Sequence, residues 1–231
     1  MSQKSSLPLR VIVTGGLGAL GRSVGAELAG RGARVALVDR AAHTAVDGVD
    51  LVVGSVDLGD PASAAAAFAK VALALGGIDA IVNVAGGFQW ETLEGGSIDT
   101  WDRMYTMNLR TAVIACREVL PYLLRQPSGR IVNVGALAAL KAAAGMGAYA
   151  ASKAGVARLT ESLAEELKDR GITVNAELPS ILDTPANRAD MPDADVARWV
   201  STQSLSGVIA FLLSEDASAV TGACLPVAGR V

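Results

Sequence analysis

The sequence predicts an α/β fold, in which a doubly wound, mainly seven-stranded parallel sheet carries helices on both faces. Short apolar runs alternate with longer segments of helical periodicity along the whole chain. The apolar runs are continuous rather than alternating, which is typical of strands buried on both faces of a parallel sheet. The chain has 231 residues, of which 51% are hydrophobic, so we expect a single domain spanning 1–231 with a sizeable core.

Seven segments have the length and composition of strands, and their alternation with helices favours right-handed βαβ units. The expected strands are 9–15, 33–39, 49–55, 77–85, 129–135, 171–178 and 223–228. The expected helices are 19–31, 61–75, 99–124, 148–170 and 204–213. Asp60 before Pro61 is typical of a helix start, with an N-cap carboxylate and a proline at the first helical position. The segment 180–203 is the longest polar insertion, and we expect a substrate-binding lid there.

Composition excludes several classes of partner. The net charge is −3 and there is no basic stripe, so no nucleic-acid partner is expected. No stretch reaches the ~20 apolar residues of a membrane span, and residues 1–10 contain no apolar run long enough for a signal peptide. Cys116, Cys224 and the lone His43 have no metal-like spacing. We therefore expect no metal and a cytoplasmic protein.

A glycine-rich turn, TGGLGALG over 14–21, follows the first expected strand and opens the first expected helix. Glycines let the backbone turn tightly and approach a pyrophosphate at a helix N-terminus, as in Rossmann-type domains. The candidate cofactor-binding residues in this turn are Gly15, Gly18, Leu20 and Gly21. The pattern is weak by itself, because an ordinary turn can contain it.

Asp39 ends the second expected strand, 18 residues after Gly21. A carboxylate there can accept hydrogen bonds from both ribose hydroxyls of NAD, and it would repel the 2′-phosphate of NADP. Arg40 follows directly and could partly offset that repulsion. We expect NAD(H) to be preferred over NADP(H); the alternative is a solvated turn aspartate.

The next two strands end in residues suited to the adenosine and the cofactor backbone. Asp57 and Leu58 are placed to meet an adenine, and a loop or capping role for Asp57 is the open alternative. Small residues around Asn83, Ala85 and Gly86 leave room for a cofactor beside the sheet.

Tyr149 and Lys153 stand four residues apart at the start of a helical pattern, which places them on one helical face. A phenol has an unperturbed pKa near 10, too high for free proton exchange at neutral pH. A neighbouring ammonium and a nicotinamide cation would both lower the pKa of Tyr149. The spacing alone is weak evidence, but its place just beyond the fifth strand makes a catalytic pair the better interpretation.

Taken together, these residues resemble the short-chain dehydrogenase/reductase family over essentially the whole chain. The matching positions are Thr14-Gly15 to Gly21, Asp57, Asn83, Ala85-Gly86, Asn108, Tyr149, Ser152-Lys153, Pro179 and Thr184-Pro185. The resemblance implies hydride transfer at a nicotinamide, with Tyr149 as proton donor or acceptor and Lys153 on the nicotinamide ribose.

The same resemblance implies further roles. Asn108 would hold a water that links Lys153 to solvent, and Pro179, Leu182 and Thr184 would contact the nicotinamide carboxamide. Family members pair their long helices across a two-fold axis, so a homodimer or homotetramer is expected.

Three positions depart from the family pattern. The middle glycine falls on Ala19, the second asparagine is Val84, and the serine expected 13 residues before the tyrosine is Ala136. Loss of one such hydrogen-bond donor can cost on the order of 10²–10³ in rate. These departures, and the stretch 178–199, are similar to the dihydropteridine reductase branch of the family.

The sequence therefore predicts an enzyme, an NAD(P)-dependent oxidoreductase that acts on a small carbonyl or alcohol substrate. A quinonoid dihydropteridine reductase and a non-catalytic NAD-binding protein are the alternatives. Phe88 and Trp90 could stack on a flat substrate ring or serve in ordinary loop packing. Ser180 could offer a hydroxyl to the substrate, and Trp199 is expected to anchor the 180–203 segment.

Overall fold

A parallel sheet forms the centre of the computed structural model, which describes residues 9–231. Within these residues, seven strands pair in the order β3-β2-β1-β4-β5-β6-β9. Their bounds are β1 Arg10–Thr14, β2 Arg34–Val38, β3 Leu51–Val53, β4 Ala80–Asn83, β5 Gly129–Val134, β6 Ile172–Pro179 and β9 Cys224–Val227. The strand order reverses between β1 and β4, and the predicted doubly wound α/β fold is confirmed. Residues 1–8, part of the stretch inspected for a signal peptide, lie outside the described residues.

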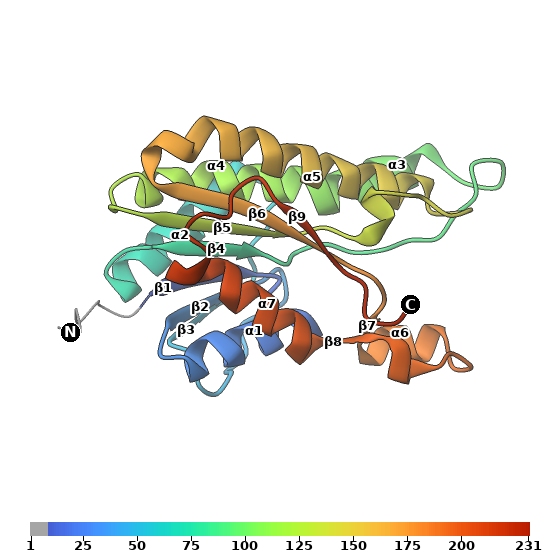
Figure 1. Ribbon diagram of the computed structural model, residues 1–231, viewed down its shortest axis with the longest axis horizontal. Helices are drawn as coiled ribbons and strands as arrows, with labels where there is room; N and C mark the ends of the chain where they lie inside the picture. The colour runs from blue at the N-terminus through green and yellow to red at the C-terminus, as the bar shows by residue number, and fades with distance from the viewer. Residues whose placement is uncertain (1–8) are drawn as a thin grey trace.

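Two helical layers cover the sheet, as Figure 1 shows with α4 and α5 above it and α1 and α7 below it. The long helices are α1 Ala19–Gly30, α2 Pro61–Leu75, α4 Thr111–Leu123, α5 Gly147–Leu167 and α7 Thr202–Leu213. One apolar cluster joins the sheet to α2, α4 and α5, and a second joins it to α1 and α7. Alternate strand residues enter the two clusters, Ile12 the first and Val11 and Val13 the second, which explains the continuous apolar runs.

Local capping fixes where the helices begin. Asp60 accepts hydrogen bonds from the N–H groups of Ala62 and Ser63, and Pro61 is the first residue of α2, as predicted. Gly76 ends this helix in the left-handed conformation with φ 76°. Such caps satisfy helix-terminal groups that have no partner inside the helix.

The prediction of a single continuous helix over 99–124 is wrong in the middle of that range. The chain forms α3 Ile98–Met104, then a π-helical stretch Tyr105–Arg110, and then α4. The wider π turn inserts an extra residue per turn, a feature frequent at functional sites. Its consequence is that Asn108 is buried and turned toward the neighbouring loop and helix.

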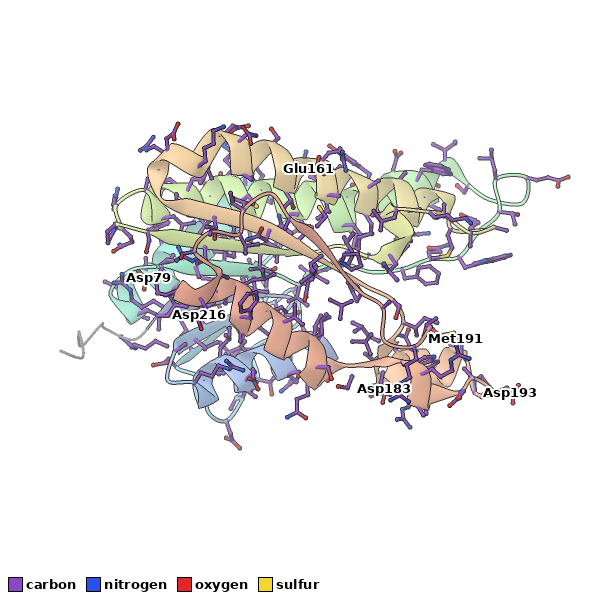
Figure 2. All side chains as sticks on the ribbon, viewed as in Figure 1. Asp79, Glu161, Asp183, Met191, Asp193 and Asp216 are labelled. Carbon is purple, nitrogen blue, oxygen red and sulfur yellow. The ribbon has the colours of Figure 1, made fainter. Side chains whose placement is uncertain are left out.

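The 180–203 segment is more regular than a polar insertion predicts. It contains β7 Leu182–Asp183, α6 Pro185–Asp190, a 3₁₀ turn Val196–Arg198 and β8 Val200–Ser201, and β7 pairs with β8 in parallel. It lies beyond the carboxyl end of β6, where Figure 2 labels Asp183, Met191 and Asp193. Within residues 9–231, none of the helices is long and apolar enough to cross a membrane.

Candidate active site

The glycine-rich turn lies against the end of β4. Gly15 has φ 62°, and a Cβ there would lie 2.8 Å from the backbone nitrogen of Ala85. A Cβ on Gly21 would collide with the carbonyl oxygen of Gly15. Gly18 is the N-cap of α1 and supplies no side-chain cap, so N–H groups of the first turn have no intrahelical acceptor. The sequence thus builds a tight turn with an anion-attracting helix end.

A cavity of about 1080 Å³ opens in front of this turn at the carboxyl edge of the sheet. Its volume is at the upper end of the ~300–1,000 Å³ range of ligand pockets. The predicted cofactor residues that line it are Gly15, Gly18, Leu20, Gly21, Asp39, Arg40, Asp57, Leu58, Ala85, Gly86 and Thr184. They lie in the loops that follow β1, β2, β3 and β4, in the first turn of α1 and in the 180–203 segment, which the fold brings to one edge.

The Asp39 carboxylate is held at the mouth of the turn. One oxygen accepts a hydrogen bond from the Leu17 N–H at 2.8 Å, and the other accepts one from the Ala41 N–H at 2.8 Å. A carboxylate has about four lone-pair sites, so each oxygen keeps acceptor capacity. The residue is therefore fixed in orientation and still able to accept hydrogen bonds from ribose hydroxyls.

Asp57 makes the capping contact that was one of its two expected roles, and it also belongs to the cavity lining. Its side chain lines the cavity, and Oδ1 accepts a hydrogen bond from the Gly59 N–H at 2.8 Å. The capping contact fixes the loop between β3 and α2 and does not use the second carboxylate oxygen.

Tyr149 and Lys153 lie on the same face of α5. The Lys153 ammonium is 6.0 Å from the centre of the Tyr149 ring and donates a hydrogen bond to the Val134 carbonyl at 2.8 Å. Lys153 is buried, so this carbonyl at the end of β5 fixes where the charge sits. The i,i+4 spacing thus produces the expected juxtaposition.

The expected lowering of the tyrosine pKa is wrong for the protein alone. Burial raises the pKa of Tyr149 to about 12, because desolvation disfavours the phenolate. Burial also lowers the pKa of Lys153 to about 8, because desolvation disfavours the ammonium. Without a further cation beside it, Tyr149 remains a neutral phenol at pH 7, suited to donating a proton.

Asn108 connects the loop after β4 to α5. Its Oδ1 accepts a hydrogen bond from the Gly87 N–H at 2.9 Å, and its Nδ2 donates to the Ser152 hydroxyl at 3.0 Å. A Cβ on Gly86 would meet Asn108 Oδ1 and would lie 3.4 Å from Lys153 Nζ. The side chain of Asn108 thus closes the space behind Lys153.

Three of the predicted cofactor-binding residues, Asn83, Pro179 and Leu182, are not among the described residues that line the cavity. The Asn83 amide donates to Asn133 Oδ1 at 2.9 Å inside the core. Pro179 is the last residue of β6, and Leu182 is the first residue of β7. Both are close in sequence to Thr184, which lines the cavity. The Ser180 hydroxyl donates its proton to the Ala228 carbonyl at 2.6 Å.

Phe88 borders the phenol. Its ring meets the Tyr149 ring edge-to-face, with 4.9 Å between centroids, while Phe88 remains 55% exposed. The Trp90 indole donates to the Ala144 carbonyl at 3.0 Å, which ties this loop to the loop before α5. Ala136, at the position where the family pattern has a serine, is buried. Trp199 is buried, in keeping with the anchoring role expected of it.

Several cavity residues were not predicted. Asp102, Arg103, Thr106 and Met107 reach the cavity from α3 and the π turn, and Pro185 and Ala186 reach it from α6. Pro185 belongs to the Thr184-Pro185 match, whereas no local motif marks Thr106 and Met107, because the π-helical backbone of Tyr105–Arg110 decides which side chains face the cleft. Ser152 was part of the motif, but its bond to Asn108 becomes visible only in the fold.

Comparison with known proteins places this geometry in a family. The model of the family described as short chain dehydrogenase matches residues 10–195. The chain is 32% identical to 2-(R)-hydroxypropyl-CoM dehydrogenase of Xanthobacter autotrophicus, over 94% of this chain and 96% of that protein. It is 30% identical to 2-dehydro-3-deoxy-L-rhamnonate dehydrogenase (NAD(+)) of a Sphingomonas species, over 94% and 93%.

A solved structure agrees with this assignment. The ligand-free aldohexose dehydrogenase of Thermoplasma acidophilum superposes with a TM-score of 0.88 at 26% identity, covering 96% of this chain and 93% of that one. The chain therefore belongs to the short-chain dehydrogenase family, whose members are oxidoreductases.

Proposed function

We propose that the chain is an NAD(H)-dependent oxidoreductase that interconverts a small carbonyl compound and its alcohol, with Tyr149 as the acid/base. The observation that carries this proposal is the juxtaposition of Tyr149 and the buried Lys153 ammonium, which lies close to Gly86 in the cavity lining. When bound, a nicotinamide cofactor supplies the hydride donor or acceptor.

The cofactor fits the residues that are present. The first turn of α1 offers N–H groups to a pyrophosphate. Gly15 and Gly21 allow the tight turn that presents these groups, because a Cβ on either residue would collide with neighbouring backbone. Asp39 would accept hydrogen bonds from the adenosine ribose, while Lys153, close to Gly86, and Thr184 would lie at the nicotinamide end. We propose NAD(H) as the preferred form because a carboxylate repels a 2′-phosphate.

We assign a separate role in the reaction to each of Tyr149, Lys153 and Asn108. Tyr149, neutral at pH 7, donates its hydroxyl proton to the carbonyl oxygen during reduction and regains it during alcohol oxidation. Lys153 holds a positive charge beside it and favours the transient phenolate. Asn108 fixes the loop at Gly87 and the Ser152 hydroxyl, which keeps α5 in register with the cleft.

The test is turnover of Tyr149→Phe with NADH and a panel of aldehydes, ketones and diketones. Phenylalanine keeps the ring contact with Phe88 but has no proton to give, so kcat should fall by about 10²–10⁴. NADH binding, followed by nicotinamide fluorescence, should stay close to wild type. The matched control is Tyr122→Phe on α4, which should keep full activity.

Two outcomes would contradict the proposal. Wild-type turnover by Tyr149→Phe would remove the acid/base role from that residue. Tight NADH binding by the wild-type protein without turnover of any substrate would instead support a non-catalytic NAD-binding protein.

A second candidate, a quinonoid dihydropteridine reductase, is favoured by Ala136. This buried methyl group cannot donate a hydrogen bond to a substrate, and an electron-poor imine needs one acid and one hydride rather than a polarised carbonyl. The same assay with a quinonoid dihydropterin tests it. Absence of pterin turnover alongside carbonyl turnover would leave the first candidate.

A further inference from the structure

Residues 227–230, which follow from β9, contact the start of the 180–203 segment. The Ser180 N–H donates to the Val227 carbonyl at 3.1 Å, and the Ser180 hydroxyl donates to the Ala228 carbonyl at 2.6 Å. Ser180 follows directly on the last residue of β6, so these bonds fix the point where the segment leaves the sheet.

The same residues also contact the far end of the segment through Arg198. The Arg198 guanidinium donates from Nε and Nη2 to the Arg230 carbonyl, at 2.9 and 2.6 Å. The Arg230 N–H donates back to the Arg198 carbonyl at 2.9 Å. Figure 1 shows the C-terminal end of the chain beside β7 and α6, in agreement with these bonds.

Gly229 allows this close approach. It has φ 64°, and a Cβ there would lie 2.9 Å from the Arg198 carbonyl oxygen and 3.1 Å from Val200 Cγ2. Any other residue would be strained in this conformation and would press on the backbone that it contacts. The sequence therefore supplies both an arginine that reaches across and a glycine that lets the backbones meet.

Inside the 180–203 segment, a pair of strands connects Arg198 to the residues that line the cavity. Val200 and Ser201 of β8 pair with Leu182 and Asp183 of β7, directly before Thr184. Thr184 caps α6 by accepting the Asn187 N–H at 3.2 Å, and Thr184, Pro185 and Ala186 line the cavity. The wall made by residues 184–186 thus connects through one strand pair to Arg198.

We propose that Arg198 is a positioning residue, which together with residues 228–230 clamps the 180–203 segment against the cleft and so slows release of the dinucleotide. This inference rests on the proposed function for the identity of the dinucleotide, NADH. The contacts themselves are independent of it, since they join two parts of the chain outside the cavity.

The experiment compares Arg198→Met and Gly229→Ala with wild type in the full chain. Methionine keeps an apolar stem but donates no hydrogen bond, and alanine disturbs the same contact from the other side. Hydrogen–deuterium exchange of the cofactor-free protein measures how firmly the 180–203 segment is held, and this measurement does not depend on enzymatic activity. Stopped-flow displacement of bound NADH reads out its effect on the cofactor.

Both variants should speed exchange in peptides covering 180–203 and should raise the NADH dissociation rate by about 5- to 10-fold, which is within the range expected when the net contribution of one exposed hydrogen-bonded contact is lost. Peptides of β1 and β4 should exchange as in wild type. Arg198→Lys retains one donor and should fall in between. The matched control is Arg158→Met, whose guanidinium pairs with Glu161 on α5, and it should change neither readout.

Three results would overturn the clamp. One is unchanged exchange in 180–203, and another is an equal rise over all peptides, which would mean general destabilisation. The third is faster exchange with an unchanged NADH dissociation rate. If wild-type protein binds no NADH, the proposed function fails, while the exchange measurement still decides whether the clamp exists.

Discussion

Asp39 is the residue whose chemistry decides the expected choice of cofactor. Its carboxylate is already fixed by the N–H groups of Leu17 and Ala41, so it cannot swing away from a phosphate placed beside it. A like-charge contact of this kind costs several kcal/mol. Arg40, which also lines the cavity, is the nearest neighbour in sequence that could compensate.

Replacement of Asp39 by alanine should therefore weaken discrimination against NADP(H). We expect the ratio of kcat/KM with NADPH to that with NADH to rise at least ~10-fold, which corresponds to about 1.4 kcal/mol. Asp39→Asn, which keeps the shape and removes the charge, should move the ratio in the same direction. The measurement is steady-state kinetics with both cofactors at several concentrations.

Asp47→Asn is the matched control, because Asp47 is an exposed loop aspartate close in sequence. It should leave the ratio as in wild type. An unchanged ratio in both Asp39 variants would show that this carboxylate does not distinguish the adenosine ribose of NADH from that of NADPH.

At the residue scale the sequence was informative wherever spacing determines contact. The i,i+4 spacing predicted that Tyr149 and Lys153 share a face, and the structure has them 6.0 Å apart, ammonium to ring centre. The pKa of Tyr149 could not be predicted in this way. It depends on how much water the surrounding side chains exclude, and burial raises it to about 12.

At the scale of elements, β6 carries an unusual residue. Glu177 is fully buried in the centre of this strand, and its two carboxylate oxygens have no hydrogen-bond partner among the described residues. Burial raises the pKa of Glu177 well above its ordinary value. Register pairs it with Val134, whose carbonyl holds Lys153, and with Leu225 of β9.

This residue should make stability depend on pH. The pKa of Glu177 is higher in the folded than in the unfolded protein, where it is about 4.3. Its contribution to the free energy of unfolding is therefore complete below about pH 4.3 and falls as pH rises toward the folded pKa, by up to about 1.4 kcal/mol per pH unit. Glu177→Leu should remove that decline, so its stability advantage over wild type should grow from pH 5 to pH 8.

Urea unfolding of both proteins at matched concentrations, from pH 5 to pH 8, measures this difference. Glu94→Leu, at an exposed loop position, is the control and should follow the wild-type pH dependence. A constant difference between Glu177→Leu and wild type across the range would mean that Glu177 does not change its ionisation on folding.

Element types were predictable where periodicity is strong, and irregular elements were not. The continuous apolar run of 171–178 marked β6 to within a residue of its bounds. The π turn at Tyr105–Arg110 left no trace in the pattern, because it keeps an apolar face and only shifts it by one residue. The two-residue strands β7 and β8 are held by pairing across 18 residues, which local composition does not encode.

At the scale of the whole molecule, alternation of strands and helices was sufficient to predict the sheet and its two helical layers. The connections are right-handed and the strands parallel, so few arrangements remain once the strands are known. The cavity at the carboxyl edge follows from the same topology, since strand order reverses between β1 and β4. The contact of Arg198 with Arg230 joins segments 32 residues apart and could be seen only in three dimensions.

The surface of the molecule also bears on its assembly, for which we propose a homodimer or homotetramer. Trp101, Tyr105 and Val113 are exposed on α3, the π turn and α4, and Phe211 and Leu225 are exposed on α7 and β9. Exposed apolar residues grouped on elements of one face are typical of interaction surfaces. Two such surfaces on one chain would allow a tetramer, and one would allow a dimer.

Light scattering coupled to size exclusion should therefore give a mass of two or four times the 23.5 kDa chain. A two-fold axis brings each residue near it close to its own copy, so a new charge there meets a like charge. Val113→Glu should halve the mass if the α4 surface forms the contact, and Phe211→Glu should do so if the α7 surface forms it. Leu73→Glu, on the exposed side of α2, is the control and should leave the mass unchanged. A wild-type mass of one chain at tens of micromolar would contradict the assembly, and an equal loss of mass in the Leu73 variant would show that any added charge, rather than a specific surface, is responsible.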